Sequence, residues 1–365
     1  MRYIESSEDK YMLAWKKKDI RSTQYVTSCL FEQVDEEKFM ERFNRYMREN
    51  DISKQYIDLK ENSIVQKERR FNDFLKVVEH DKHLSITKLI HMCDSCAVLS
   101  IVFQPARNMV YFVGDHVIYD GIHAIKYFQK YALDLSMDMV DIHRLCPKRF
   151  DIVTATSTLL PCVHDILPLS NQTGHLVDSP NTQVRHIFHK WDLLTLKCTK
   201  QRLNISMTAV MLGKYLHGIF EQMKLPRLTV AVIVGMRPTP SDEEYPTNGL
   251  AFIVMNVEYN TDVTSLMKQV QREMAKKAYH VAATSHPLCY DMLAQHGIQG
   301  IREKVDVCFT TIPISKTTSH LSGCKLANVG VHFHNLSYPI YCCFISDGDV
   351  SYGTTNTRVS ALSEF

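Results

Sequence analysis

Long hydrophobic runs are absent from this 365-residue chain, in which no stretch approaches the ~18 apolar residues that a membrane-spanning helix needs. An excess of charge of one sign is also absent, because 42 basic residues face 40 acidic ones and the net charge is +2. This balance gives no support for nucleic acid or an anionic membrane as the main partner. The N-terminal residues 1–19 contain acids and no apolar h-region, so we predict no signal peptide.

A second Cys-x-x-Cys pair is missing as well. The pair formed by Cys93 and Cys96 cannot supply the four ligands of a structural zinc site by itself. It leads into a predicted strand rather than a helix N-terminus, which is unfavourable for a redox dithiol. Eleven cysteines in a chain without an export signal indicate reduced thiols and a cytoplasmic protein. We therefore expect no metal and no bound cofactor.

Apolar sequence is present in an amount that can build a full core, with 45% hydrophobic and 22% charged residues. The length allows about two domains or one large one, since domains usually have ~100–200 residues. Strand-like and helix-like patterns alternate in both halves, which predicts an α/β (α+β) protein with two subdomains. Between residues 146 and 182 the periodicity is lost and prolines gather. We predict an N-terminal subdomain at 1–145, a linker at 146–182 and a C-terminal subdomain at 183–365.

Apolar periodicity defines the expected elements of both subdomains. The helices are expected at 35–47, 71–78, 192–202, 206–223 and 261–281, and the strands at 25–34, 97–104, 109–113, 184–191, 228–234, 250–259, 305–312, 340–345 and 350–354. A hairpin should join the strands at 97–104 and 109–113. Asp347-Gly348 predicts a tight turn between the last two strands.

One stretch, residues 108–131, carries the main candidate for chemistry. Its strand runs from Met109 to Val113, Gly114 ends the apolar run, and His116 follows on a short link. Asp120 can cap the helix that comes next. A neutral imidazole is available near pH 7, since the unperturbed pKa of histidine is ~6.5, so His116 can act as a base. The alternative is an ordinary satisfied polar residue, because the chain has 17 histidines.

The stretch from His116 to Gly121 resembles the His-x-x-x-Asp-Gly signature of the chloramphenicol acetyltransferase-like superfamily. That group includes condensation domains of peptide synthetases, BAHD and alcohol acyltransferases, and wax ester synthases. The resemblance implies two similar subdomains that form a pseudo-dimer with a tunnel between them, and His116 as a general base at their interface. Two departures are visible. Asp115 stands where many members have a second His, and the plant-type Asp-Phe-Gly-Trp-Gly motif is absent.

Softer matches follow in the order that the superfamily shows. The segment 234–238 with 247–249 is similar to its "Arg-Pro … Gly-Asn" strand–loop–strand, and 305–311 to a strand that brings a hydroxyl towards the tunnel. By resemblance, Asp120 points away from the tunnel and pairs with Arg237, so both residues are structural at the site, and Gly121 gives the helix start room to pack. Thr310 or Thr311 would donate to the oxyanion, although threonines are also ordinary strand residues.

Two further groups of polar residues are predicted to lie on the surface. The basic runs Lys16–Lys18 and Lys276–Lys277 could meet coenzyme A phosphates, but a charge run is more often a solvated face. His332 and His334 alternate on a strand pattern and share one face, which favours exposed positions over ligand duty.

The function that the resemblance implies is acyl transfer from a CoA thioester to a hydroxyl or amine acceptor. Acyl-CoA would be a co-substrate, and the chain would act as a monomer because two subdomains already make the pseudo-dimer. Two alternatives stay open: a condensation-type enzyme fed by a carrier protein, and a non-catalytic binding protein that keeps the fold.

Overall fold

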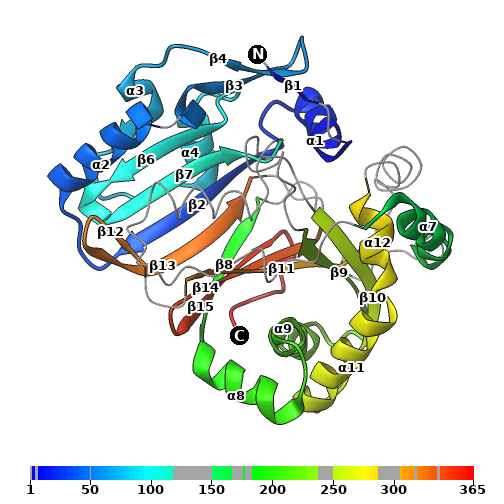
Figure 1. Ribbon diagram of the computed structural model, residues 1–365. Coiled ribbons are helices and arrows are strands. Elements are labelled where there is room, and N and C mark those ends of the chain that lie inside the picture. Colours follow the sequence, from blue (N-terminus) through cyan, green and yellow to red (C-terminus); the bar gives the residue numbers. More distant parts are fainter. Residues whose placement is uncertain are drawn as a thin grey trace. The chain divides into compact units, whose positions relative to one another are not determined.

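The computed structural model describes residues 2–4, 7–49, 51–117, 150–166, 176, 183–236, 250–286, 305–315, 319–334 and 338–365. The chain divides into two compact units, shown in Figure 1. The described part of the first unit is made mainly of residues 2–117 and 319–334. The second contains 150–166, 183–236, 250–286, 338–365 and most of 305–315.

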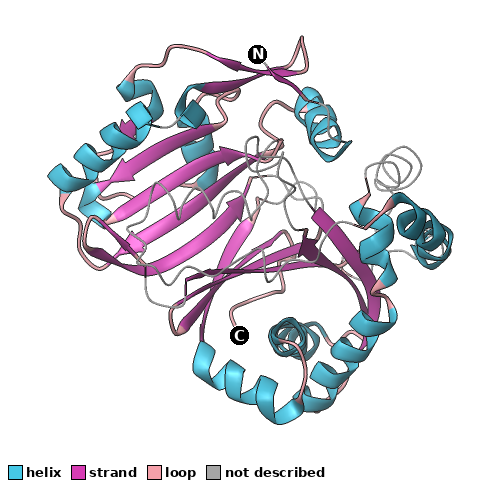
Figure 2. Ribbon diagram, viewed as in Figure 1, coloured by secondary structure: helices cyan, strands magenta, loops and turns pink. Residues whose placement is uncertain are grey.

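The first unit is built on a six-stranded sheet in the order β12-β13-β2-β7-β6-β5, with a small sheet β1-β4-β3 beside it. Figure 2 shows its strands and helices by colour. The helices and short helical turns are α1 (Ser7–Lys18), α2 (Glu36–Glu49), η1 (Asp51–Lys54), α3 (Phe71–Phe74), α4 (Ile86–Met92) and η2 (Pro105–Arg107). The strands are β1 (Arg2–Tyr3), β2 (Gln24–Phe31), β3 (Gln55–Asp58), β4 (Ser63–Gln66), β5 (Leu75–Val77), β6 (Leu99–Gln104), β7 (Met109–Asp115), β12 (His320–Leu321) and β13 (Cys324–Phe333).

Helices cover both faces of this sheet. On one face, Phe39 and Phe43 of α2 pack against aromatic rings of the strands, with Phe43 to Phe112 at 6.5 Å between centroids. On the other face, α4 packs over a cluster that includes Tyr111 and Val113. Successive residues of a strand point to opposite faces. On β7, Phe112 therefore lies on the α2 face, and Tyr111, Val113 and the last residue, Asp115, lie on the α4 face.

The second unit contains a six-stranded sheet in the order β10-β9-β11-β14-β15-β8. One face packs on α9 and α11, and the other on a smaller cluster with α7 and α12. The helices are α7 (Ile152–Ile166), α8 (Leu193–Leu203), α9 (Met207–Met223), α11 (Val263–Lys276) and α12 (Tyr279–Ser285). The strands are β8 (Arg185–Asp192), β9 (Arg227–Gly235), β10 (Leu250–Glu258), β11 (Val307–Ser315), β14 (Ile340–Asp347) and β15 (Val350–Thr357). Among helices in the described ranges, none has the length and apolarity to cross a bilayer.

The predicted α/β class is confirmed, and so are the β6–β7 hairpin and the turn between β14 and β15, where Gly348 has a φ of 60°. Three predictions are wrong. Residues 71–78 are helical only to Phe74, because β5 then pairs in parallel with β6. The linker predicted at 146–182 contains α7, a helix whose buried Ala155, Cys162 and Ile166 recur at helical spacing. The helix expected over 261–281 stops at Lys276, and α12 follows separately.

Strand β13, of which the sequence pattern showed only the end near His332, alters the domain organisation. It belongs to the C-terminal half of the sequence but pairs with β2 in the sheet of the first unit. The first unit therefore draws on residues beyond the linker. The boundaries at 145 and 183 stay a prediction, since residues 118–149 and 177–182 lie outside the described residues.

A buried histidine lies in the core of the second unit. His189 is 4% exposed, its Nε2 lies 2.9 Å from Thr355 Oγ1, and the rings of Tyr215 and Phe344 surround it. Burial lowers the pKa of His189 to about 4. The unfolded chain therefore binds the proton more readily than the folded one.

The stability of the second unit should fall as the pH is lowered through this window. The neutral, buried His189 contributes fully to the free energy of unfolding above pH ~6.5, the pKa of histidine in the unfolded chain. This contribution is lost as the pH falls towards about 4, the pKa in the folded chain, and the loss at pH 4 is about 3 kcal/mol. His189→Gln should remove that part of the pH dependence of urea unfolding. His164→Gln, at an exposed site on α7, is the control. Equal slopes between pH 6.5 and 4 in the wild type and His189→Gln would contradict this assignment.

Candidate active site

Strand β7 does not end at Val113, as predicted, but continues to Asp115. Gly114 lies opposite Tyr25 of β2 in the antiparallel register. A Cβ atom at position 114 would lie 2.7 Å from both Cζ and Oη of Tyr25. Real Cβ atoms do not approach other atoms so closely. A larger residue here would therefore require the Tyr25 ring, which lies directly across the strand, to move.

His116 is the first residue after β7 and is partly exposed. Its ring stands edge-on to Tyr25, with centroids 6.0 Å apart and an interplanar angle of 69°. The Tyr25 ring in turn lies 6.2 Å from that of Phe333 on β13. The His116 backbone N–H donates to the Thr23 carbonyl over 2.9 Å. The imidazole thus projects from a braced backbone on the face of Gly114.

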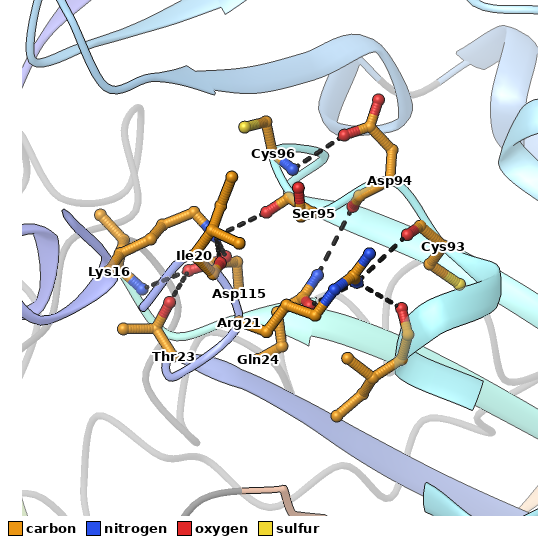
Figure 3. Close-up of polar contacts among 12 residues, drawn as sticks. Lys16, Ile20, Arg21, Thr23, Gln24, Cys93, Asp94, Ser95, Cys96 and Asp115 are labelled. Atoms are coloured by element: carbon orange, nitrogen blue, oxygen red, sulfur yellow. Dashed lines mark hydrogen bonds and ion pairs between the residues drawn. The ribbon is translucent and has the colours of Figure 1, made fainter. Parts of the chain in front are cut away.

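Asp115 points to the opposite face and is completely buried. Its Oδ2 accepts from Lys16 Nζ at 2.6 Å. Its Oδ1 accepts from the Thr23 hydroxyl at 2.9 Å and from the Val117 N–H at 3.0 Å. Figure 3 shows the carboxylate among Lys16, Thr23 and the segment from Cys93 to Cys96. Both oxygens therefore have partners, which a carboxylate without access to water requires.

Lys16, in the last turn of α1, is buried with a side-chain exposure of 0%, so the prediction of a solvated basic run is wrong for this residue. Besides Asp115, its ammonium donates to the Ile20 carbonyl at 2.7 Å and the Ser95 carbonyl at 2.5 Å. Three donors meet three acceptors, so the cation is fully satisfied. Lys17 and Lys18 are exposed, as predicted.

The Cys-x-x-Cys segment forms a structural turn. Arg21 Nη1 donates to the carbonyls of Ile90 at 2.6 Å and Cys93 at 3.4 Å, which closes the C-terminal end of α4. Burial raises the pKa of the Cys93 thiol to about 11, which disfavours the reactive thiolate. In the ranges that the structure describes, no group of three or more His, Cys, Asp and Glu side chains could hold a metal ion.

His332 was predicted to lie on the surface, and this prediction is wrong. It is 2% exposed, and its Nε2 lies 2.7 Å from Ser28 Oγ on the neighbouring strand. His334, on the same face, is partly buried and lies 3.3 Å from Thr87 Oγ1. The cause is α4, which covers this face of the sheet.

The other predicted site residues are placed only in part. Asp120, Gly121 and Arg237 lie outside the described residues, so their structural roles stay predictions. Thr310 and Thr311 lie on β11 of the second unit, and consecutive strand residues face opposite sides. Thr311 shares the face of Phe309, whose ring packs on Tyr215 of α9. Thr310, 9% exposed, lies on the other face.

Lys16, Thr23 and Tyr25 were missed as site residues. The available signal was Asp115 itself: an aspartate at the end of an apolar strand needs a partner if that strand is buried. The sequence did not indicate which of the chain's basic residues would reach it.

No protein-family model and no curated protein matches the sequence, whereas solved structures match it over nearly the whole chain. A starter condensation domain of rhizomide synthetase RzmA, a double mutant in complex with C8-CoA and Leu-SNAC, has a TM-score of 0.67 at 11% identity, covering 99% of this chain and 90% of that one. The wax ester synthase/diacylglycerol acyltransferase from Marinobacter aquaeolei VT8 has a TM-score of 0.59 at 11% identity, covering 97% and 93%. The first condensation domain of the CDA synthetase has a TM-score of 0.63 at 8% identity, covering 98% and 90%.

The chain therefore has the two-subdomain fold of these condensation domains and of the wax ester synthase, and the predicted fold class is confirmed. The tunnel between the subdomains stays a prediction.

Lys16→Met should lower the free energy of unfolding by about 3–5 kcal/mol, because it leaves the Asp115 carboxylate buried without its cation. Lys325→Met is a matched control: Lys325 and Glu32 also lie 2.6 Å apart, but both are exposed, so the loss should stay below about 1 kcal/mol. Urea unfolding measures both. Lys16→Met/Asp115→Leu should cost less than the two single changes added together. Equal losses in Lys16→Met and Lys325→Met would show that the buried pair is absent in solution.

Proposed function

We propose that this protein transfers an acyl group from a thioester to a hydroxyl or amine acceptor, with His116 as the general base. One observation carries the proposal: a partly exposed imidazole, oriented by Tyr25 and by a backbone hydrogen bond, stands at the end of β7 in a chain with this fold. The similar structures include an acyltransferase and condensation domains, one of them in complex with C8-CoA.

The reaction needs a proton to move twice. His116 takes the proton from the acceptor's O–H or N–H while the acceptor oxygen or nitrogen attacks the thioester carbonyl. The tetrahedral intermediate then collapses, the C–S bond breaks, and the imidazolium returns the proton to the departing thiolate. One imidazole can serve as base and then as acid, and such proton transfer contributes ~10²–10⁴-fold to the rate.

The remaining residues support this step. Asp120 and Arg237 would form the ion pair that holds the link after His116, and Gly121 would give the following helix room. The oxyanion donor would be Thr310 or Thr311, which lie on opposite faces of β11, Thr310 buried and Thr311 partly exposed.

The donor is proposed to be a free acyl-CoA, which acts as a co-substrate and not as a bound cofactor. A carrier-protein thioester is the second candidate, favoured by the condensation domains among the similar structures. The two differ in a direct assay, because an enzyme of the second kind would use an acylated carrier and ignore acyl-CoA. Monomeric state and cytoplasmic location stay predictions.

His116→Ala should abolish turnover and leave the melting temperature unchanged, since the side chain is partly exposed. The lost barrier stabilisation is about 3–5.5 kcal/mol, the equivalent of 10²–10⁴-fold. Octanoyl-CoA is the donor probe, offered with a panel of primary alcohols and amines. Release of CoA thiol and mass spectrometry of the acylated acceptor give the rate.

The exposed His80→Ala is the control and should match the wild type. Activity of His116→Ala within about threefold of the wild type would remove His116 from the mechanism, since the expected loss is at least 10²-fold. If the wild type binds octanoyl-CoA calorimetrically but acylates no acceptor, and an acylated carrier also fails, the non-catalytic alternative holds.

Thr310→Val or Thr311→Val, whichever removes the donor, should lower kcat by about 10²-fold with little effect on KM, because the hydroxyl would bind the oxyanion more strongly than the ground-state carbonyl. The other variant has nearly the same shape change on the opposite face of β11 and should change kcat by less than about threefold. The same octanoyl-CoA assay measures both. A change of less than about threefold in both variants would remove the donor role from both threonines.

A further inference from the structure

We infer that Asp115, held in place by Lys16, is a positioning residue for His116 and acts through the backbone from the opposite side of the sheet. The inference rests on the proposed role of His116 as the base. It concerns the geometry of that base and not its chemistry.

Asp115 cannot take part in the reaction directly. Its side chain points to the face opposite the imidazole and is completely inaccessible to solvent. Its two oxygens already accept from Lys16, Thr23 and Val117. No substrate could reach such a group, and it makes no contact with the His116 ring. Any effect on the base must therefore pass through the main chain.

The main chain is held on both sides of the catalytic residue. The orientation of the peptide plane before His116 is fixed, because the His116 N–H donates to the Thr23 carbonyl at 2.9 Å. The plane after it is pinned because the Val117 N–H donates to Asp115 Oδ1 at 3.0 Å. The φ and ψ angles of His116 are the rotations between these two planes, so both angles are restrained. The Thr23 hydroxyl, bound to the same Oδ1, joins the two restraints into one network.

Lys16 makes this arrangement possible in a buried location. A carboxylate taken out of water needs a cation close by. The Lys16 ammonium also bonds to Ile20 and Ser95, so it ties the end of α1 and the 93–96 turn to the end of β7. Its role is thus to hold Asp115 in the one orientation that meets the Val117 N–H.

Two double variants separate the effect of the hydrogen-bond acceptor at position 115 from the effect of the buried charge. Lys16→Met/Asp115→Asn and Lys16→Met/Asp115→Leu both avoid a lone buried charge, but only asparagine keeps an oxygen for the Val117 N–H. The leucine variant should lose about 10²-fold in kcat with a nearly unchanged KM, since a displacement of ~1 Å at a catalytic group costs that much. The asparagine variant should retain at least about ten times more kcat than the leucine variant.

Two readouts report on positioning without turnover. Amide hydrogen exchange at Val117 should be faster in the leucine variant than in the asparagine variant. The His116 ring signals in a ¹H–¹³C spectrum, assigned with His116→Ala, should shift or broaden only in the leucine variant. Gln104→Leu is the stability control, because Gln104 is buried at the opposite end of the β6–β7 pair and bonds to the His80 and Lys82 carbonyls. It should lower the melting temperature and leave kcat unchanged.

The outcomes distinguish this inference from the proposed function. If the wild type acylates in a His116-dependent way and the leucine and asparagine variants have equal kcat, the positioning role is overturned. A fall in kcat in Gln104→Leu as large as in the leucine variant would overturn it too, since general destabilisation would then suffice. If His116-dependent transfer is never seen, the proposed function fails, and exchange at Val117 still decides positioning: equal rates in the two variants reject it.

Discussion

The first unit is organised at one end of its sheet by a buried ion pair. Lys16 and Asp115 are both without solvent exposure, and the removal of two charges from water costs several kcal/mol for each ion before any attraction is counted. The arrangement persists because every donor of the ammonium and both oxygens of the carboxylate have partners. Such a pair adds little net stability compared with an apolar core. What it does supply is a defined geometry, since the helix α1, the turn at 93–96 and the end of β7 must all meet at one point.

Side chains alternate between the two faces of β7, so the ion pair and His116 lie on opposite sides of the strand. Gly114 and His116 belong to one face, and Asp115 to the other. The buried face takes the charge pair, while His116 on the other side is partly exposed. In its observed position the Tyr25 ring leaves no room for a Cβ at position 114, and it stands against the imidazole. Of three consecutive residues, Gly114 thus leaves room for the Tyr25 ring, Asp115 binds Lys16, and His116 is the proposed base.

Asp115 is also the position at which this chain departs from many members of the superfamily that its motif resembles. The departure is accommodated locally, because a lysine 99 positions earlier completes the carboxylate's hydrogen bonding. Similarity to solved structures at 8–11% identity fits this picture. A fold depends on which positions are apolar and on how elements pair, and individual polar residues can change when their partners change with them.

The sequence by itself determined the α/β class, most of the strands and helices, the hairpin that leads to His116, and the resemblance in the motif. These properties depend on periodicity within a single element and on short turns, which are local. Tertiary structure alone decided that Lys16 is buried while Lys17 is exposed, that His332 meets Ser28, and that residues 75–77 form a strand. It also placed Thr310 and Thr311 relative to the helices of the second unit. In each case the deciding partner comes from a distant segment, 304 positions away for Ser28 and His332, so the pattern around a residue shows which face it occupies but not what covers that face.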